Sequence, residues 1–188
     1  MLAHLSLPTE SSQSLKYLLD AGFSLDSLPA DIIRHSYKES VFFLIPDKLN
    51  PPSGAEAGAD VIEYLKVRQS IANPDSVRST YGTKIVGAKK QQKLERKRNL
   101  SRQEFLVLLS SRVNSNLLPI TRDIEVFTYQ NSVYSLEKVK VGGETLKFLR
   151  VSSVPKSGGH KIPPFLTIGR EITNEPQYST RQLAQPLK

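Results

Sequence analysis

Short runs of alternating apolar and polar residues dominate the second half of this 188-residue chain. The clearest of them cover residues 93–100, 124–129 and 132–139. Alternation with a period of two is typical of a β-strand with one buried face. Gln130-Asn131 separates two of the runs, which predicts a hairpin, and Gly142-Gly143 turns the chain into a further strand at 146–152. The pattern predicts a β-rich α+β fold, and we expect its strands to close into an antiparallel barrel.

One helix is predicted inside this series of strands. Ser101 and Glu104 have the spacing of a capping box, in which each side chain accepts a hydrogen bond from the other residue's backbone N–H group. A largely apolar stretch follows from Phe105 to Leu109, and Pro119 ends the connection to the next strand. The barrel is therefore expected to carry one inserted helix.

Residues 1–58 differ from the rest of the chain in charge. They hold four Lys or Arg and seven Asp or Glu, a net charge of −3, whereas residues 59–188 carry +11. Residues 50–54, Asn-Pro-Pro-Ser-Gly, have the composition of a linker. We expect an acidic leader at 1–58 and a basic β-barrel domain at 59–188. So basic a domain favours a polyanionic partner: nucleic acid, a phosphorylated small molecule or an anionic membrane surface.

The leader is predicted to contain two helices and one strand. Leu15, Leu18 and Leu19 have helical spacing behind a serine-rich start, and Gly22 would end that helix. Residues 29–31, Pro-Ala-Asp, predict a second helix start, because Pro suits the first turn and Asp suits the positive end of the helix dipole. Residues 40–45, which are apolar from Val41 onward, predict a strand that ends before Pro46.

Composition excludes several classes of site. Cysteine is absent, which rules out disulfides, zinc–thiolate sites, iron–sulfur clusters and a cysteine nucleophile. The three histidines, His4, His35 and His160, are not at the spacing of metal ligands. Neither the P-loop pattern nor the dinucleotide-binding glycine pattern occurs. The longest apolar run, 41–45, is too short for a membrane-spanning helix.

Basic residues are densest between positions 84 and 102, where Glu95 is the only acid. The stretch contains Lys84, Lys89, Lys90, Lys93, Arg96, Lys97, Arg98 and Arg102. It predicts either a phosphate-binding surface or a solvated hairpin tip whose lysines protect a sheet edge. Later strands carry Arg122, Lys138, Lys140, Lys147, Arg150 and Arg170. These cations are either ordinary surface charges or, in a closed barrel, the lining of a cavity that needs an anion such as a triphosphate.

Acidic residues that could hold a divalent ion are sparse. Asp123 and Glu125 are two apart and share a strand face, which fits either a metal pair or an exposed strand. The remaining candidates, Glu95, Glu137 and Glu171, are isolated in sequence. Aromatic side chains are also scarce near the basic stretch, where only Tyr81 lies close. This weakens the case for RNA, because RNA-binding modules usually stack bases on aromatic side chains.

The C-terminal segment resembles a known family. Residues 162–173, Ile-Pro-Pro-Phe-Leu-Thr-Ile-Gly-Arg-Glu-Ile-Thr, followed by Pro176, Tyr178, Ser179 and Leu183, are similar to the closing segment of CYTH domains, the triphosphate-tunnel barrels. The likeness is closest to the C-terminal CYTH-like domain of translocation-defect-fourteen-type proteins and covers roughly residues 60–185. It implies an antiparallel barrel of about eight strands, in which glutamates bind Mg²⁺ or Mn²⁺ and basic residues bind a triphosphate.

Candidate site residues follow from the basic stretches and from the resemblance. The expected phosphate-binding residues are Lys84, Lys97, Arg122, Arg150 and Arg170, and the metal ligands, if a metal site survives, are Glu95, Glu137 and Glu171. The chain departs from the family where the opening strand shows only Glu63, and where Arg150 takes the place of a late carboxylate. An arginine in that place removes a metal ligand and adds a cation, so metal chemistry should weaken while attraction for phosphate is kept.

Three functions compete at this point. The favoured hypothesis is a non-catalytic CYTH-like module that binds a nucleotide, polyphosphate or phosphoinositide in a basic tunnel, with no required cofactor. The alternative is an accessory subunit of a ribonucleoprotein or organelle complex, in which the basic surface meets RNA or the leader docks onto a protein partner. The third is a metal-dependent triphosphatase using Mg²⁺ or Mn²⁺.

Overall fold

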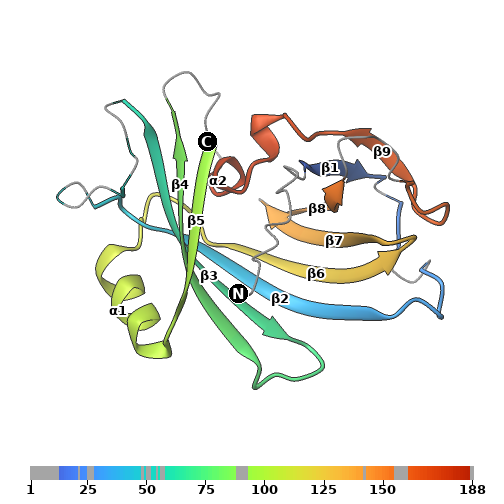
Figure 1. Cartoon of the computed structure of the whole chain (residues 1–188), viewed down its shortest axis with the longest axis horizontal. Coiled ribbons are helices and arrows are strands. Elements are labelled where there is room, and N and C mark those ends of the chain that lie inside the picture. The colour runs from blue at the N-terminus through green and yellow to red at the C-terminus, as the bar shows by residue number, and fades with distance from the viewer. Residues whose placement is uncertain are drawn as a thin grey trace, which may run out of the picture. The chain divides into compact units, whose positions relative to one another are not determined.

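The computed structural model describes residues 13–20, 22–24, 28–47, 49, 52–53, 55, 58–87, 93–141, 143–154 and 161–186. These residues form nine strands, two α-helices and a short 3₁₀ helix (Figure 1). The strands are β1 (Gln13–Leu19), β2 (Arg34–Phe43), β3 (Asp60–Ser70), β4 (Val77–Val86), β5 (Lys93–Leu100), β6 (Ile120–Tyr129), β7 (Ser132–Val141), β8 (Glu144–Val154) and β9 (Ile168–Glu171). The helices are α1 (Arg102–Arg112), η2 (Pro176–Tyr178) and α2 (Thr180–Leu183). Within this described part, neither α-helix is long and apolar enough to span a membrane.

The strands form one sheet in the order β5-β4-β3-β2-β6-β7-β8-β1-β9. The pairs β2–β3, β3–β4, β4–β5, β1–β8 and β1–β9 are antiparallel. The predicted α+β class with a mostly antiparallel sheet is confirmed. The predicted closure into a barrel is not: β5 and β9 are the edge strands of the described sheet, and no pairing joins them. Closure needs a hydrogen-bonded ladder between the outermost strands, and β9 has only 4 residues for one.

Both helices predicted in the leader are wrong. Residues 13–19 form β1, where Tyr17 and Leu19 are buried with the period of two that a strand requires. Residues 28–33 form turns and bends, and Ile33, expected near the start of a helix, is 80% exposed. The strand predicted at 40–45 exists as β2, which begins earlier and ends at Phe43.

The predicted inserted helix and the predicted hairpin are confirmed. Ser101 caps α1: its side chain accepts a hydrogen bond from the Glu104 N–H, and the Glu104 carboxylate accepts one from the Ser101 N–H. Between β6 and β7, Gln130 and Asn131 both have positive φ, 45° and 62°. Two such residues are what a two-residue hairpin turn of type I′ requires.

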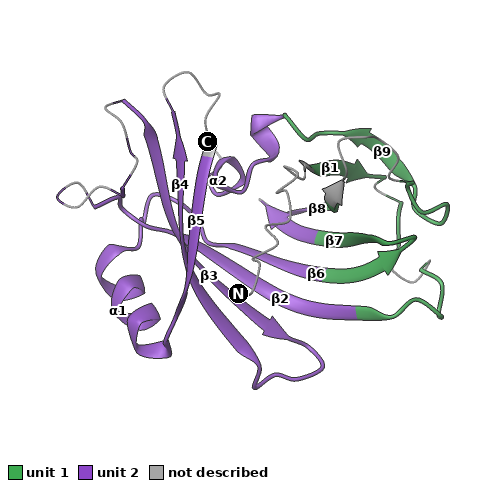
Figure 2. Cartoon of the chain, in the orientation of Figure 1, with its two compact units in different colours: residues 1–34, 125–137, 147–174 green, residues 35–124, 138–146, 175–188 purple. Residues whose placement is uncertain are grey.

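The chain divides into two compact units that do not follow its order (Figure 2). Unit 1 contains residues 1–34, 125–137 and 147–174, and unit 2 contains 35–124, 138–146 and 175–188. In unit 1, Phe127 stacks on Tyr134 with ring centroids 5.4 Å apart, inside a cluster of buried side chains from β1, β6, β7 and β8. In unit 2, Leu65 and Leu100 pack with Phe105 of α1, which lies beside β4 and β5 (Figure 1).

Candidate anion-binding face

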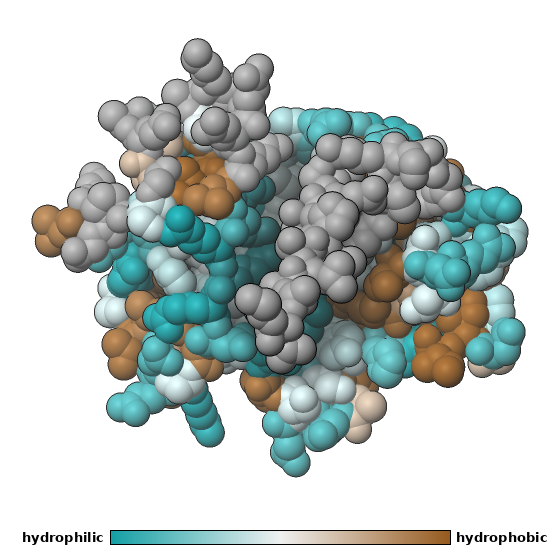
Figure 3. Space-filling model, viewed as in Figure 1, coloured by the Kyte–Doolittle hydropathy of each residue, from teal (hydrophilic) through white to brown (hydrophobic). Residues whose placement is uncertain are grey.

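The register of β3, β4 and β5 separates their side chains into two faces of unit 2. Leu65 pairs with Tyr81, which pairs with Arg98, so these three lie on the face that α1 covers, called here the helix face. Lys66 is the next residue along β3 and lies on the opposite face, called here the Glu39 face. The Glu39 face includes Glu39, Tyr64, Lys66, Arg68, Lys84, Glu95, Lys97 and Arg122. Residues 94–99 of β5 are exposed, and hydrophilic side chains gather over β4 and β5 in Figure 3.

Glu39 lies at the centre of a charged cluster on its face. Its side chain is only 3% exposed. Arg68 Nη2 lies 2.7 Å from Glu39 Oε2, Lys66 Nζ lies 3.6 Å from the same oxygen, and Arg122 Nε lies 3.0 Å from Oε1. Arg122 is almost completely buried, whereas Lys66 and Arg68 are partly exposed. Among the described residues, one negative charge here faces three positive charges.

A second acid on this face, Glu95, is more exposed. The Tyr64 hydroxyl donates a hydrogen bond of 2.8 Å to Glu95 Oε1, and Lys97 Nζ lies 3.1 Å from Oε2. Partial burial opposes ionisation of Glu95, but the hydrogen bonds from Tyr64 and Lys97, with the charges of Lys97 and Lys84, lower its pKa. Glu95 is thus an ionised acid held among cations.

The cluster around these two carboxylates carries more positive than negative charge. Among the described residues it contains five cations, Lys66, Arg68, Lys84, Lys97 and Arg122, an excess of three positive charges. Burial lowers the pKa of Lys66, and the positive charges of Arg68, Lys97 and Arg122 lower it further, against the opposing effect of Glu39. The cations are therefore close enough to repel one another, and an anion bound among them would relieve that repulsion.

Gly82 allows the aromatic ring of Tyr64 to lie across β4. A Cβ atom on Gly82 would be 2.2 Å from Tyr64 Cζ and 2.5 Å from its hydroxyl oxygen. Only a residue without a side chain fits beneath this ring. The glycine is what permits the tyrosine to reach Glu95 on a nearby strand.

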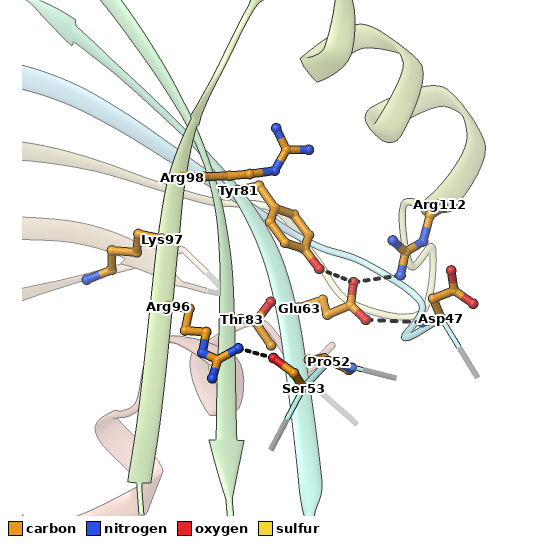
Figure 4. Close-up of a pocket in the computed structure, with 10 residues that line it drawn as sticks. All are labelled: Asp47, Pro52, Ser53, Glu63, Tyr81, Thr83, Arg96, Lys97, Arg98 and Arg112. Atoms are coloured by element: carbon orange, nitrogen blue, oxygen red, sulfur yellow. Dashed lines mark hydrogen bonds and ion pairs between the residues drawn. The ribbon is translucent and has the colours of Figure 1, made fainter. Parts of the chain in front are cut away.

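The helix face has a polar pocket of about 350 Å³ that is built differently (Figure 4). Its buried acid is Glu63, whose side chain is 1% exposed. Arg112 Nη2 and the Tyr81 hydroxyl donate to Glu63 Oε2 at 2.6 and 2.7 Å, and the Asp47 N–H donates to Oε1 at 3.1 Å. Tyr81 and Arg112 both point at Glu63, whereas Lys97 points away from them (Figure 4). Within the part of the chain that is described, this carboxylate meets one cation and two neutral donors.

Unit 1 carries a smaller set of charges on one face of β1, β8 and β9. Arg150 pairs with Lys16 and Arg170 with Leu18, so both arginines share the Lys16 face. Arg150 Nε lies 2.9 Å from Glu137 Oε1, and Lys16 Nζ lies 3.8 Å from the centre of the Phe148 ring. Glu137 in this unit is therefore also an acid bound to a cation.

The predicted phosphate-binding residues are divided between the units. Lys84, Lys97 and Arg122 lie together on the Glu39 face of unit 2, and Arg150 and Arg170 share a face in unit 1. The convergence of all five on one cavity stays a prediction. Lys89 and Lys90 of the basic stretch, and His160, lie outside the described residues.

Within unit 1, the sheet register does not bring the predicted metal ligands Glu137 and Glu171 together, and a shared site with Glu95 stays a prediction. Glu171 pairs with Tyr17 and so lies on the face of β1 opposite to Lys16, where it accepts a hydrogen bond from Thr173 Oγ1 at 2.6 Å. Glu137 is on the Arg150 side, and Glu125, from the Asp-x-Glu pair, faces Arg34 at 3.4 Å. Among the residues that the structure describes, no three acidic or histidine side chains gather closely enough to hold a metal ion.

Sequence reasoning missed three residues of the Glu39 face. Lys66 and Arg68 follow Tyr64 at intervals of two, and Leu65 and Val67 between them are apolar. This alternation was sufficient to place both cations on one strand face, away from Leu65. Glu39 was missed because the helix expected from residue 29 onward obscured the start of β2.

Comparison with solved structures finds chains that share the fold of this protein over most of its length. One match is "The crystal structure of the hypothetical protein NE1496", with a TM-score of 0.51, 14% identity, and coverage of 95% of this chain and 100% of that one. Another, "The crystal structure of the inorganic triphosphatase NE1496", has a TM-score of 0.52, 13% identity, and coverage of 94% and 96%. No family model and no curated protein matches the chain.

These matches show that the chain shares its fold with NE1496. Because they cover 94% and 95% of the chain, the likeness extends into the leader, beyond the segment whose sequence resembles the family. This agrees with the pairing of β1 with β8 and of β2 with β3. At identities of 13% and 14%, the likeness concerns the fold alone.

Proposed function

We propose that this protein is a CYTH-like module that binds a phosphorylated ligand, such as a polyphosphate, on the Glu39 face. The observation that carries the proposal is the excess of three positive charges around Glu39 and Glu95, five cations against two carboxylates among the described residues. Lys66, Arg68 and Lys97 are partly exposed and so accessible to a ligand. Phosphate groups suit such a site because their oxygens accept several charge-assisted hydrogen bonds from arginine and lysine at once.

We further propose that the module does not hydrolyse its ligand. A divalent ion needs oxygen ligands that converge, and three acids among the described residues contact cations instead. Glu39 contacts Arg68 and Arg122, Glu95 contacts Lys97, and Glu137 contacts Arg150. The residues described do not fit an Mg²⁺ site, so no step of the proposal runs through a metal.

A metal-dependent triphosphatase is the second candidate. One observation favours it: the structural neighbour NE1496 is named an inorganic triphosphatase. Incubation of the protein with tripolyphosphate and Mg²⁺ or Mn²⁺, followed by measurement of released phosphate, tests it directly. Turnover that a substitution on the Glu39 face such as Lys97→Gln abolishes would replace the binding proposal with an enzymatic one.

Isothermal titration calorimetry with tripolyphosphate tests the binding proposal. The test variant is Lys66→Gln/Arg68→Gln, and the matched control is Arg96→Gln/Arg98→Gln, which removes the same charge from the helix face of β5. A hydrogen bond to a charged group contributes about 1.5–3 kcal/mol. We therefore expect the test variant to bind more than about tenfold more weakly, and the control to change by less than about threefold.

Equal weakening in both variants would mean that tripolyphosphate responds only to net charge, and the proposal would then fail. A parallel titration with a single-stranded RNA oligonucleotide addresses the assembly hypothesis. RNA binding that depends on Arg96 and Arg98, together with no binding of tripolyphosphate, would move the functional surface to the helix face.

A further inference from the structure

Glu39 contacts the same cations that a bound anion on this face would contact. We infer that Glu39 is an internal counter-ion, which weakens ligand binding and keeps the cations around it folded together when no ligand is present. This inference rests on the proposed function, since it assigns a role to one residue of the same site. It differs from the proposal because it predicts an increase in affinity when an acid is removed.

The contacts of Glu39 are those that a phosphate group would make. Its two oxygens lie beside two guanidinium groups and one ammonium group, at 2.7, 3.0 and 3.6 Å. A phosphate presents the same negatively charged oxygens to the same kinds of donor. A ligand on this face must therefore share cations that Glu39 already uses.

Burial shows which side of the cations the ligand can reach. The Glu39 side chain is 3% exposed, whereas those of Lys66 and Arg68 are 24% and 37% exposed. The carboxylate lies beneath, and the two longer side chains reach solvent. A ligand then approaches from the open side and leaves Glu39 in place, so its negative charge acts against the ligand through the shared cations.

Glu39 has a second effect on the free protein. Without it, Lys66, Arg68 and Arg122 would face one another without the negative charge that now lies between them, and Arg122 is almost entirely buried. A buried charge that loses a partner destabilises a fold. Removing the charge of Glu39 should therefore lower the melting temperature of the free protein and increase the stabilisation that the ligand supplies.

The variant Glu39→Gln tests this, because glutamine keeps the shape and one acceptor oxygen but carries no charge. Its control is Glu104→Gln, the same change on the helix face at an acid that is 49% exposed and contacts Arg98; glutamine at this position also suits the capping box. Affinity for tripolyphosphate is measured by calorimetry at fixed ionic strength, and melting temperature with and without tripolyphosphate. We expect Glu39→Gln to bind about tenfold more tightly or better, and Glu104→Gln to change by less than about threefold.

The outcomes separate the two claims. If the wild type binds and Glu39→Gln binds equally or more weakly, Glu39 orients the cations rather than opposing the ligand, and the inference is overturned while the proposed function stands. If wild type and variant are folded and neither binds, the proposed function itself fails. Binding by Glu39→Gln but not by the wild type would support the inference, because it would show that the Glu39 carboxylate neutralises the cations of the native face.

A second variant keeps the inference testable should Glu39→Gln fail to fold. Glu39→Asp retains the charge but withdraws the carboxylate from the cations by one methylene group. It should bind tripolyphosphate more tightly than the wild type, by a smaller factor than the glutamine variant. Weaker binding by the aspartate variant would contradict the counter-ion role.

Discussion

The two buried glutamates of unit 2 lie on opposite faces of the sheet and have different surroundings. Glu63, on the helix face, forms an ion pair with Arg112 and accepts hydrogen bonds from the Tyr81 hydroxyl and the Asp47 N–H. Glu39, on the other face, is outnumbered by the cations of the described residues around it. Around Glu63 the negative charge is balanced by one cation, whereas around Glu39 the positive charges exceed the negative charge.

This difference helps to separate a structural ion pair from a binding site. A buried carboxylate that is neutralised by one cation and hydrogen-bonded by other donors leaves no excess charge to attract a ligand. Removing its cation nevertheless destabilises the fold. A buried carboxylate surrounded by an excess of cations leaves a field that attracts anions. The count of charges around each acid is more informative here than burial, because both Glu39 and Glu63 are almost completely buried.

Breaking the Glu63 pair should have the largest effect on stability. In Arg112→Met the methionine keeps much of the apolar stem, but Glu63, 1% exposed, loses the cation that contacts it. Removal of one partner of a buried pair costs about 3–5 kcal/mol, so chemical denaturation should show a large loss in free energy of unfolding. Affinity for tripolyphosphate should stay unchanged, because Arg112 is on the helix face.

The double variant Arg112→Met/Glu63→Gln is the control for this prediction. It also removes the negative charge of Glu63, which Arg112→Met leaves buried without its cation. The double variant should therefore recover most of the lost stability. If Arg112→Met folds but no longer binds tripolyphosphate, the two faces are not independent, and the contrast drawn between Glu39 and Glu63 breaks down.

A smaller loss is expected from Gly82→Ala. The new methyl group would overlap the Tyr64 ring and push its hydroxyl away from Glu95. Overpacking of this kind costs about 1–3 kcal/mol, measured as a decrease in the free energy of unfolding. The same substitution in a Tyr64→Ala background should cost much less, because the overlapping ring is absent, and a cost that is undiminished there would show that Gly82 matters for another reason.

The smallest effect concerns pH. Burial, together with Arg68, Lys97 and Arg122, lowers the pKa of Lys66 below the ordinary value of 10.5, against the effect of Glu39. Between the two values the unfolded chain binds more protons than the folded one, so this group makes stability rise with pH. Tripolyphosphate affinity should move the opposite way and fall as Lys66 loses its charge, by up to roughly tenfold for one charged contact.

Lys66→Arg is the comparison for this prediction, because arginine stays charged throughout that pH range. Calorimetric titrations of both proteins at each pH cancel the ionisation of the ligand itself. The difference in tripolyphosphate affinity between the two proteins should widen as pH rises toward 10.5. A constant difference would show that a group other than Lys66 causes the pH dependence.

Local signals predicted the parts of the fold that local contacts decide. The capping box at Ser101 and Glu104 and the hairpin turn at Gln130-Asn131 are both short-range features, and both are present as expected. The first strand was mistaken for a helix because its leucine spacing fits either structure. Its identity depends on β8 and β9, near the other end of the chain, whose hydrogen bonds hold residues 13–19 as a strand.

The candidate site was predictable only in part, for a similar reason. The alternation of side chains within β5 places Lys97 on one strand face, and Lys66 and Arg68 could have been found in the same way in β3. No local pattern indicates that Glu39 and Arg122, which are distant in the chain, form one charged cluster with them.

The amino-acid sequence alone determined that this chain is β-rich, basic over residues 59–188, free of cysteine chemistry and equipped with one capped helix among its strands. These properties are set by side chains and their near neighbours. The tertiary structure decided which charges meet, since sheet register sends each strand residue to one face or the other and sets it beside residues distant in the chain. That is why, in the described part of the chain, Glu63 contacts Arg112 as its cation and Glu39 contacts three cations.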